Sequence, residues 1–215
     1  MITTVLFDLD GTLVDTAPDL GFALNLQLKK HGKPMLSDLT IRPVASHGSR
    51  GLIGLGFGVT PSDANFLALR DEYLNLYDQV FTRSPKLFDG MDQVLRTLEK
   101  QKINWGIVTN KPRRFTQPLV QSLGLHTRAV CVVSGDDAAK PKPSPETLML
   151  ACKVAQVKSE NCIYIGDAAR DIEAGKAAGM KTAVALFGYI DKSDKPQEWG
   201  ADTMIQTPAD ILQLI

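Results

Sequence analysis

The feature that most constrains the fold is a pair of aspartates at the end of a short apolar run near the N-terminus. Val5-Leu6-Phe7 has the length and composition of a buried strand, and Asp8-Leu9-Asp10-Gly11-Thr12 follows it directly. Because side chains alternate along a strand, Asp8 and Asp10 can point toward the same crevice. Open α/β sheets place their chemistry at the carboxyl ends of strands. The pair therefore predicts a metal-binding site at such an edge, although aspartate and glycine are also ordinary turn residues.

The composition is that of a globular chain with a small-molecule partner. Of the 215 residues, 44% are apolar, which suits one large domain or one domain with an insertion. Lys and Arg total 24, as do Asp and Glu, so no basic surface points to nucleic acid. No apolar segment reaches the roughly 20 residues that a bilayer span needs. We expect a cytoplasmic monomer or homodimer that binds neither nucleic acid nor membrane, with buried, reduced cysteines.

Strand-like and helix-like segments alternate from residue 86 onward, a pattern typical of a parallel sheet with helices on its faces. The predicted strands are 104–109, 129–134, 162–166, 182–187 and 203–205. The predicted helices begin at Pro112, Ser144, Ala169 and Pro208. The first three of these strands end in polar residues. Because the carboxyl ends of parallel strands share one edge, these polar residues should meet Asp8 and Asp10 in space.

Residues 15–85 lack a convincing buried strand and contain two long helical patterns, 18–31 and 61–81. We expect a helical domain inserted after the acidic turn of the first strand, with hinges at 14–16 and 84–86. Residues 1–14 and 86–215 would form a Rossmann-like sheet core. The insertion would then lie over the predicted site.

Four polar motifs at predicted strand ends together fit phosphoryl transfer. They are Asp8-Leu9-Asp10, Thr109-Asn110, Lys140-Pro141, and Gly166-Asp167 with Asp171 four residues on. The reaction needs an in-line nucleophile, a group that binds the phosphoryl oxygens, a cation, and a hard metal held by oxygen ligands. Four residues can fill these roles in that order: Asp8, Thr109, Lys140 and Asp167.

These motifs resemble the four ordered motifs of the haloacid dehalogenase superfamily, and the resemblance covers essentially the whole chain. The insertion is similar to the cap of the phosphoglycolate phosphatase-like branch, which also has the spacing of Asp167 and Asp171. The resemblance implies that Asp8 forms an aspartyl phosphate. It also implies that Asp10 is the general acid and afterwards the base.

The same resemblance implies Mg²⁺ held by Asp8, Asp10 and Asp167, with the backbone carbonyl of Asp10 among the ligands and Asp171 just outside them. Of the two lysines in Lys140-Pro141-Lys142-Pro143, the first matches the family pattern, so the resemblance assigns charge compensation to Lys140.

Asp10 also separates the branches of this superfamily, because the dehalogenating members lack a second aspartate in the first motif and need no metal. Halide release is therefore not expected. Two alternatives to a phosphatase remain open. One is a sugar-phosphate mutase, which shares all four motifs, and the other is a non-catalytic phosphate-binding regulator, whose signature would be a missing nucleophile, acid or metal ligand.

The segment 46–51, Ser-His-Gly-Ser-Arg-Gly, resembles the small-residue cap loop that contacts substrate in the phosphoglycolate phosphatase branch. Arg50 is the candidate for binding a carboxylate of the substrate, because its guanidinium offers a matching planar fork. His47, Ser49 and Asn110 are further candidate substrate contacts. For Arg50 and His47 the alternative is a side chain that faces solvent.

Further stretches, such as 86–91 and 105–112, look like the subgroup that includes N-acetylmuramic acid 6-phosphate phosphatases. The expected partner is thus a small carboxylated phosphate ester, either N-acetylmuramic acid 6-phosphate or 2-phosphoglycolate.

Overall fold

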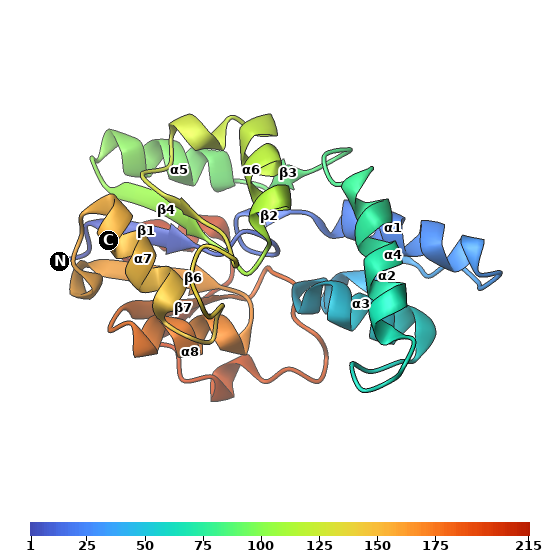
Figure 1. Ribbon diagram of the computed structural model, residues 1–215. Coiled ribbons are helices and arrows are strands. Elements are labelled where there is room, and N and C mark those ends of the chain that lie inside the picture. Colours follow the sequence, from blue (N-terminus) through green and yellow to red (C-terminus); the bar gives the residue numbers. More distant parts are fainter.

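A six-stranded parallel sheet forms the centre of the larger part of the molecule in the computed structural model, which describes residues 1–215 (Figure 1). The strands are β1 Thr4–Phe7, β4 Asn104–Val108, β5 Val132–Val133, β6 Cys162–Gly166, β7 Lys181–Ala185 and β8 Thr203–Ile205. Their order is β5-β4-β1-β6-β7-β8. The chain therefore continues to one side of β1 and then returns to the other side, which places β1 at the switch point where such sheets open a crevice. The predicted α/β class is confirmed.

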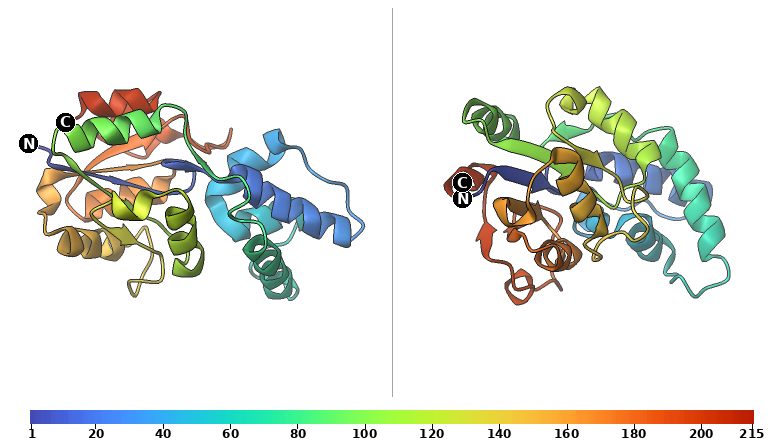
Figure 2. Two further views of the ribbon diagram at one scale, coloured as in Figure 1. Left: turned by 90° about the horizontal axis from the view of Figure 1, so that it is seen from above. Right: turned by 60° about the vertical axis from the view of Figure 1, so that its left-hand side comes forward.

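Two layers of helices cover the sheet, and Figure 2 shows them on its opposite faces. The helices are α5 Met91–Lys100, α6 Arg113–Ser122, α7 Glu146–Ala155 and α8 Ala169–Ala177, with short 3-10 turns at Leu125–Thr127, Ser159–Asn161, Pro196–Glu198 and Pro208–Gln213. Val5 and Phe7 of β1 join a cluster with α5 and α6, whereas Leu6 joins a second cluster with α7 and α8. This division follows from the alternation of side chains along a strand.

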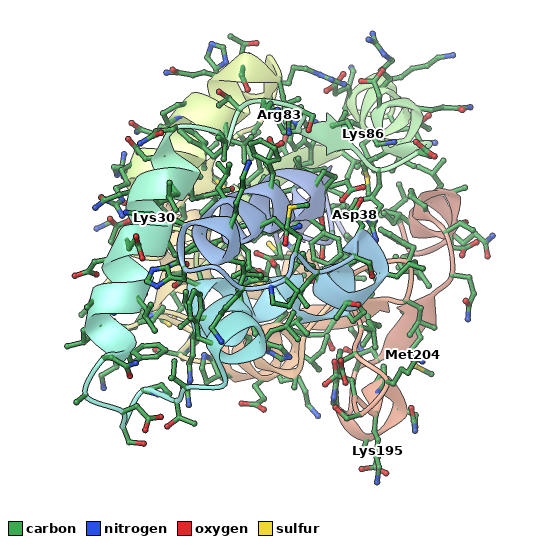
Figure 3. The ribbon with its side chains drawn as sticks, turned by 90° about the vertical axis from the view of Figure 1, so that its right-hand side faces the viewer. Lys30, Asp38, Arg83, Lys86, Lys195 and Met204 are labelled. Carbon is green, nitrogen blue, oxygen red and sulfur yellow. The ribbon has the colours of Figure 1, made fainter.

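The segment between β2 Val14–Asp15 and β3 Lys86–Leu87 is helical and lies at the right of Figure 1, beyond the carboxyl ends of the strands. It contains α1 Ala17–Lys30, α2 Asp38–Ile41, a 3-10 turn Arg42–His47, α3 Gly48–Phe57 and α4 Phe66–Asp78. β2 and β3 pair antiparallel, so the outgoing and returning chains run side by side. Figure 3 views this segment, here called the cap, from its outer side.

One local prediction for the cap is wrong. Residues 46–51 are the end of a 3-10 turn and the first turn of α3, not a loop. Each glycine lowers helix stability by about 1 kcal/mol relative to alanine, which made the segment resemble a loop. Leu52 and Ile53 of α3 are completely buried in the hydrophobic cluster of the cap. Their burial outweighs the weak intrinsic preference.

Two simpler expectations concern the whole chain. None of its helices combines the length and apolar character required to cross a bilayer. The cysteines Cys131, Cys152 and Cys162 are free and buried, as predicted.

Candidate active site

Asp8 follows β1 directly, and its backbone N–H donates a hydrogen bond of 2.8 Å to the carbonyl of Ile165, which anchors the acidic turn to β6. The turn continues through Gly11, whose φ is +85°, in the left-handed region that favours glycine. A Cβ at this position would collide with the carboxylate of Asp167 and the ring of Tyr189. The acidic turn can therefore lie this close to Asp167 and Tyr189 only because residue 11 has no side chain.

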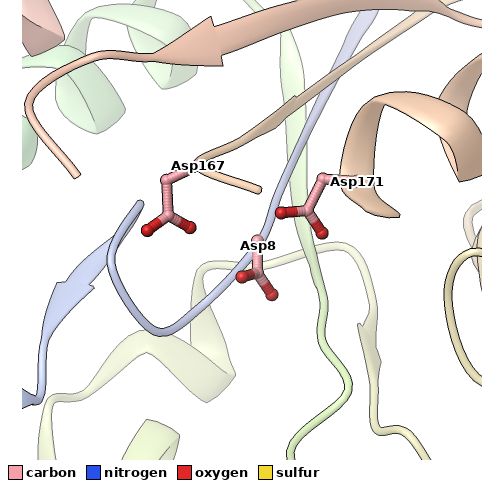
Figure 4. A group of neighbouring side chains, drawn as sticks. All are labelled: Asp8, Asp167 and Asp171. Atoms are coloured by element: carbon pink, nitrogen blue, oxygen red, sulfur yellow. The ribbon is translucent and has the colours of Figure 1, made fainter. Parts of the chain in front are cut away.

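Three buried carboxylates meet at this point, from Asp8, Asp167 and Asp171 (Figure 4). One oxygen of each lies within 4.8 Å of the others. Burial and the charges of Asp8 and Asp171 raise the pKa of Asp167 to about 7. Burial also raises the pKa of Asp8, although Lys142 opposes the effect. The group is thus a concentrated negative charge that needs cations.

The buried cation in contact with this group is Lys142. Its Nζ atom donates to Asp8 Oδ1 at 2.9 Å and to Asp171 Oδ1 at 2.7 Å, and its side chain has no exposed surface. Burial lowers the pKa of Lys142, but the carboxylates of Asp171 and Asp8 outweigh this effect, so the pKa lies above its ordinary value. The ammonium therefore remains charged and stabilises both carboxylates.

The prediction that Lys140 fills this position is wrong. Lys140 is exposed, and its only hydrogen bond runs from its backbone N–H to Glu146. The backbone of Lys142 is held instead by Asn110, whose amide donates to the Lys142 carbonyl and accepts from the Lys142 N–H, both at 2.9 Å. Asn110 borders the cavity described below, but both polar atoms of its side chain are used in this way.

Thr109 follows β4 directly and is almost fully buried. Its Oγ1 atom accepts a hydrogen bond of 3.1 Å from the backbone N–H of Lys111. Asp10 lies across the cavity from the cap. Its Oδ1 atom accepts hydrogen bonds from Lys111 Nζ at 3.0 Å and from Thr16 Oγ1 at 2.5 Å, whereas its Oδ2 atom accepts none from the protein. The structure therefore gives Asp10 a different environment from the three clustered carboxylates.

A cavity of about 1060 Å³ lies between these residues and the cap. Asp8, Asp10 and Thr109 line it from the sheet side. The predicted cap contacts His47, Ser49 and Arg50 line the other side, with His47 and Arg50 exposed. The structure thus brings together every predicted site residue except Lys140, with Asp167 and Asp171 just behind the cavity wall.

Several residues at the site were not predicted from the sequence. Ser46 of the cap donates through Oγ to Asp167 Oδ2 at 2.5 Å, and Arg170 donates to the Ser46 carbonyl at 2.7 Å. Tyr189 donates its backbone N–H to the same Asp167 oxygen at 2.8 Å. These contacts join residues that are more than 20 positions apart. Ser46 lies in the segment 46–51 that the sequence marks, but no pattern there indicates its contact with Asp167. Lys111 differs, because it directly follows Thr109-Asn110 and could have been found from that position.

Comparisons with known proteins agree with this geometry. A family model described as haloacid dehalogenase-like hydrolase matches residues 5–185. An N-acetylmuramic acid 6-phosphate phosphatase from Pseudomonas putida is 41% identical over 100% of this chain and 96% of its own length. A phosphoglycolate phosphatase from Xanthomonas campestris is 40% identical over 95% of this chain and 92% of its own length.

The fold also matches a solved structure. A haloacid dehalogenase-like family hydrolase from Streptococcus pneumoniae superposes with a TM-score of 0.81 at 23% identity, covering 99% of this chain and 98% of the other.

Proposed function

Because the chain belongs to the haloacid dehalogenase-like hydrolases and is a phosphomonoester hydrolase, we propose that it hydrolyses a small carboxylated phosphate ester through an aspartyl phosphate on Asp8. The observation that carries the proposal is the position of Asp8, at the floor of the cavity with Lys142 2.9 Å away. The similar phosphatases favour hydrolysis over the mutase and the non-catalytic regulator.

In the first step, an oxygen of Asp8 attacks phosphorus, and the bond from phosphorus to the leaving oxygen breaks in line. Lys142 holds the other oxygen of Asp8, so the nucleophile keeps one orientation during the attack. Thr109, at the end of the neighbouring strand, lines the same cavity and is positioned to bind a phosphoryl oxygen.

Asp10 is the proposed acid and base. Since Thr16 and Lys111 both bind its Oδ1 atom, Oδ2 remains free to carry a proton in the cavity. The proton passes from Oδ2 to the leaving oxygen as its bond to phosphorus breaks. In the second step Oδ2 takes a proton from water as the water oxygen attacks phosphorus. The bond from phosphorus to the Asp8 oxygen breaks, which releases inorganic phosphate and restores both residues.

The donor set fits a hard divalent cation. Three buried carboxylates lie within 4.8 Å of one another, and the one ammonium among them does not balance their charge. Asp171 is held by Lys142 and by the backbone N–H of Ala168. Asp8 keeps its Oδ2 atom free, and Asp167 Oδ1 accepts only a hydrogen bond of 3.3 Å from Thr12. These two residues are the proposed Mg²⁺ ligands, together with the Asp10 carbonyl. Mg²⁺ would supply positive charge to the phosphoryl oxygens.

Arg50 supports the carboxylated substrate class. It lines the cavity from α3, and Arg70 lines it from α4. An exposed guanidinium facing a cavity is free to bind a carboxylate of the substrate. Both classes of similar phosphatase are named for esters that carry this group.

A panel of phosphate esters tests the proposed function. With Mg²⁺, we expect N-acetylmuramic acid 6-phosphate to be hydrolysed with a higher kcat/KM than N-acetylglucosamine 6-phosphate, which lacks the lactyl acid, and a chelator to abolish both activities. 2-Phosphoglycolate is measured alongside them. The preference for the acid should be roughly 10- to 150-fold, the equivalent of one charge-assisted hydrogen bond.

The variant Arg50→Ala should lose that preference and keep its activity on the acid-free ester. Equal rates on acid-bearing and acid-free esters would reject the substrate class, but they would leave the phosphatase chemistry standing. Full activity in the chelator would reject the metal.

A further inference from the structure

Lys111 connects the proposed general acid to the cap. Its Nζ atom lies 3.0 Å from Asp10 Oδ1 and 2.7 Å from the hydroxyl of Tyr77, which belongs to α4. The Lys111 side chain is 6% exposed, so the ammonium depends on these two partners rather than on water. The Asp10 carboxylate is its only ion-pair partner.

The backbone of Lys111 is fixed to the sheet core. Its carbonyl accepts hydrogen bonds from Thr116 Oγ1 and from the backbone N–H of Gly135, both at 3.0 Å. Lys111 therefore moves with the core, whereas Tyr77 moves with the cap. The ammonium lies at the boundary between the two.

Tyr77 of the cap packs against both the core and the Lys111 ammonium. Its side chain is buried, its ring centroid lies 5.1 Å from that of Phe115 in α6, and the Lys111 ammonium lies 4.8 Å from the ring centre. Tyr77 thus binds the ammonium with its hydroxyl while its ring shields it from solvent. A shift of α4 away from the core would remove both contacts and admit water.

We propose that Lys111 is a positioning residue that holds the Asp10 carboxylate in its working orientation only while Tyr77 of the cap is in contact with it. The inference rests on the proposed function, since it assigns to Lys111 the orientation of the acid. Docked Tyr77 leaves Lys111 one position, from which it binds Oδ1 and leaves Oδ2 directed at the leaving oxygen. Without Tyr77 the ammonium is hydrated, and the Thr16 hydroxyl is then the one remaining protein donor that holds Asp10 Oδ1.

Two esters with different leaving groups test this role. p-Nitrophenyl phosphate releases a stable phenolate and needs little help from an acid, whereas 2-phosphoglycolate releases an alkoxide that must be protonated. In rapid-quench first-turnover measurements, Lys111→Met should slow 2-phosphoglycolate roughly 10- to 100-fold and p-nitrophenyl phosphate less than about 3-fold, because only one reaction depends on an oriented acid.

The companion variants separate orientation from structural damage. Lys111→Arg, which keeps the charge, should recover part of the rate on 2-phosphoglycolate. Tyr77→Phe keeps the ring and should slow the same ester by roughly 3- to 10-fold. The double variant with Lys111→Met should be no slower on 2-phosphoglycolate than Lys111→Met alone, because both substitutions break the same contacts from Tyr77 through Lys111 to Asp10. Lys153→Met, an exposed lysine of α7, serves as the control and should match the wild type.

Equal losses on the two esters, no loss on either, or additive effects of the two variants would overturn the inference alone. A wild-type protein that is inactive with Mg²⁺ on these two esters and on N-acetylmuramic acid 6-phosphate would overturn the proposed function, and the inference with it.

Discussion

The balance of charge among a few buried residues explains the arrangement of the site. Lys142 is the cation that stabilises Asp8 and Asp171, so its removal leaves buried charges without a partner. Lys142→Met should reduce kcat/KM by at least about 100-fold, and it should lower the free energy of unfolding by about 3 to 5 kcal/mol. Lys140→Met should leave both unchanged, because Lys140 is exposed. Phosphatase assays measure kcat/KM, and urea unfolding measures the free energy of unfolding. Larger losses in Lys140→Met than in Lys142→Met would contradict this account.

The same two lysines show how far the sequence predicts a site. Asp8, Thr109 and Asp167 could be placed because each follows a strand, and parallel strands bring their carboxyl ends together. Lys140 and Lys142 lie on an irregular segment, and each precedes a proline. The backbone path there is fixed by the contact of Asn110 with Lys142, which links residues 32 positions apart. No local pattern contains that information.

Helices α1 and α4 of the cap are joined by Glu72, whose carboxylate contacts Lys30 at 2.6 Å, His31 at 2.6 Å and Gln27 at 3.0 Å. Burial would raise the pKa of Glu72, but these three partners outweigh it and lower the pKa to about 2. A carboxyl group with a lowered pKa stabilises the folded state above its ordinary pKa, and this contribution is lost as the pH falls toward the folded value.

Glu72→Gln should therefore lower the free energy of unfolding by about 1 to 2 kcal/mol at pH near 7. The difference from the wild type should shrink below pH about 4.5, as the unfolded-state carboxyl becomes protonated. Urea unfolding over a pH series measures it, with Glu160→Gln, an exposed residue, as the control. If the difference in the free energy of unfolding between the wild type and Glu72→Gln stays constant from pH 7 to pH 3, the lowered pKa of Glu72 is not its cause.

The elements differ in how well the sequence predicts them. The strands are short apolar runs between polar turns, and α1 and α4 have clear helical periodicity, so their positions follow from the sequence. α3 does not, because four of its ten residues are glycine and its formation depends on burial of Leu52 and Ile53 against other cap helices. That burial is a property of the assembled cap.

The whole molecule consists of a sheet core and a cap joined by two adjacent strands, β2 and β3. We propose that residues 15–85 move as a unit over the core, because a cap must exclude water during attack and then release product. With Mg²⁺ and a phosphate mimic such as beryllium fluoride, the radius of gyration from solution scattering should decrease. Hydrogen exchange at 14–16 and 84–86 should slow. Asp8→Asn provides the control, since it lacks the carboxylate that the mimic requires. If the mimic changes neither the scattering nor the hydrogen exchange of the wild type, the proposed motion is contradicted.

The most direct test of the account is to identify the residue that carries the phosphoryl group. Protein mixed with substrate and Mg²⁺ is quenched in acid, reduced with borohydride and digested, and the peptides are analysed by mass spectrometry. An aspartyl phosphate is converted to homoserine by this treatment, so we predict homoserine at position 8 in the wild type and none in Asp8→Asn, which should also be inactive. Homoserine at another aspartate, or hydrolysis by Asp8→Asn at a rate near that of the wild type, would contradict the assignment of Asp8 as the nucleophile.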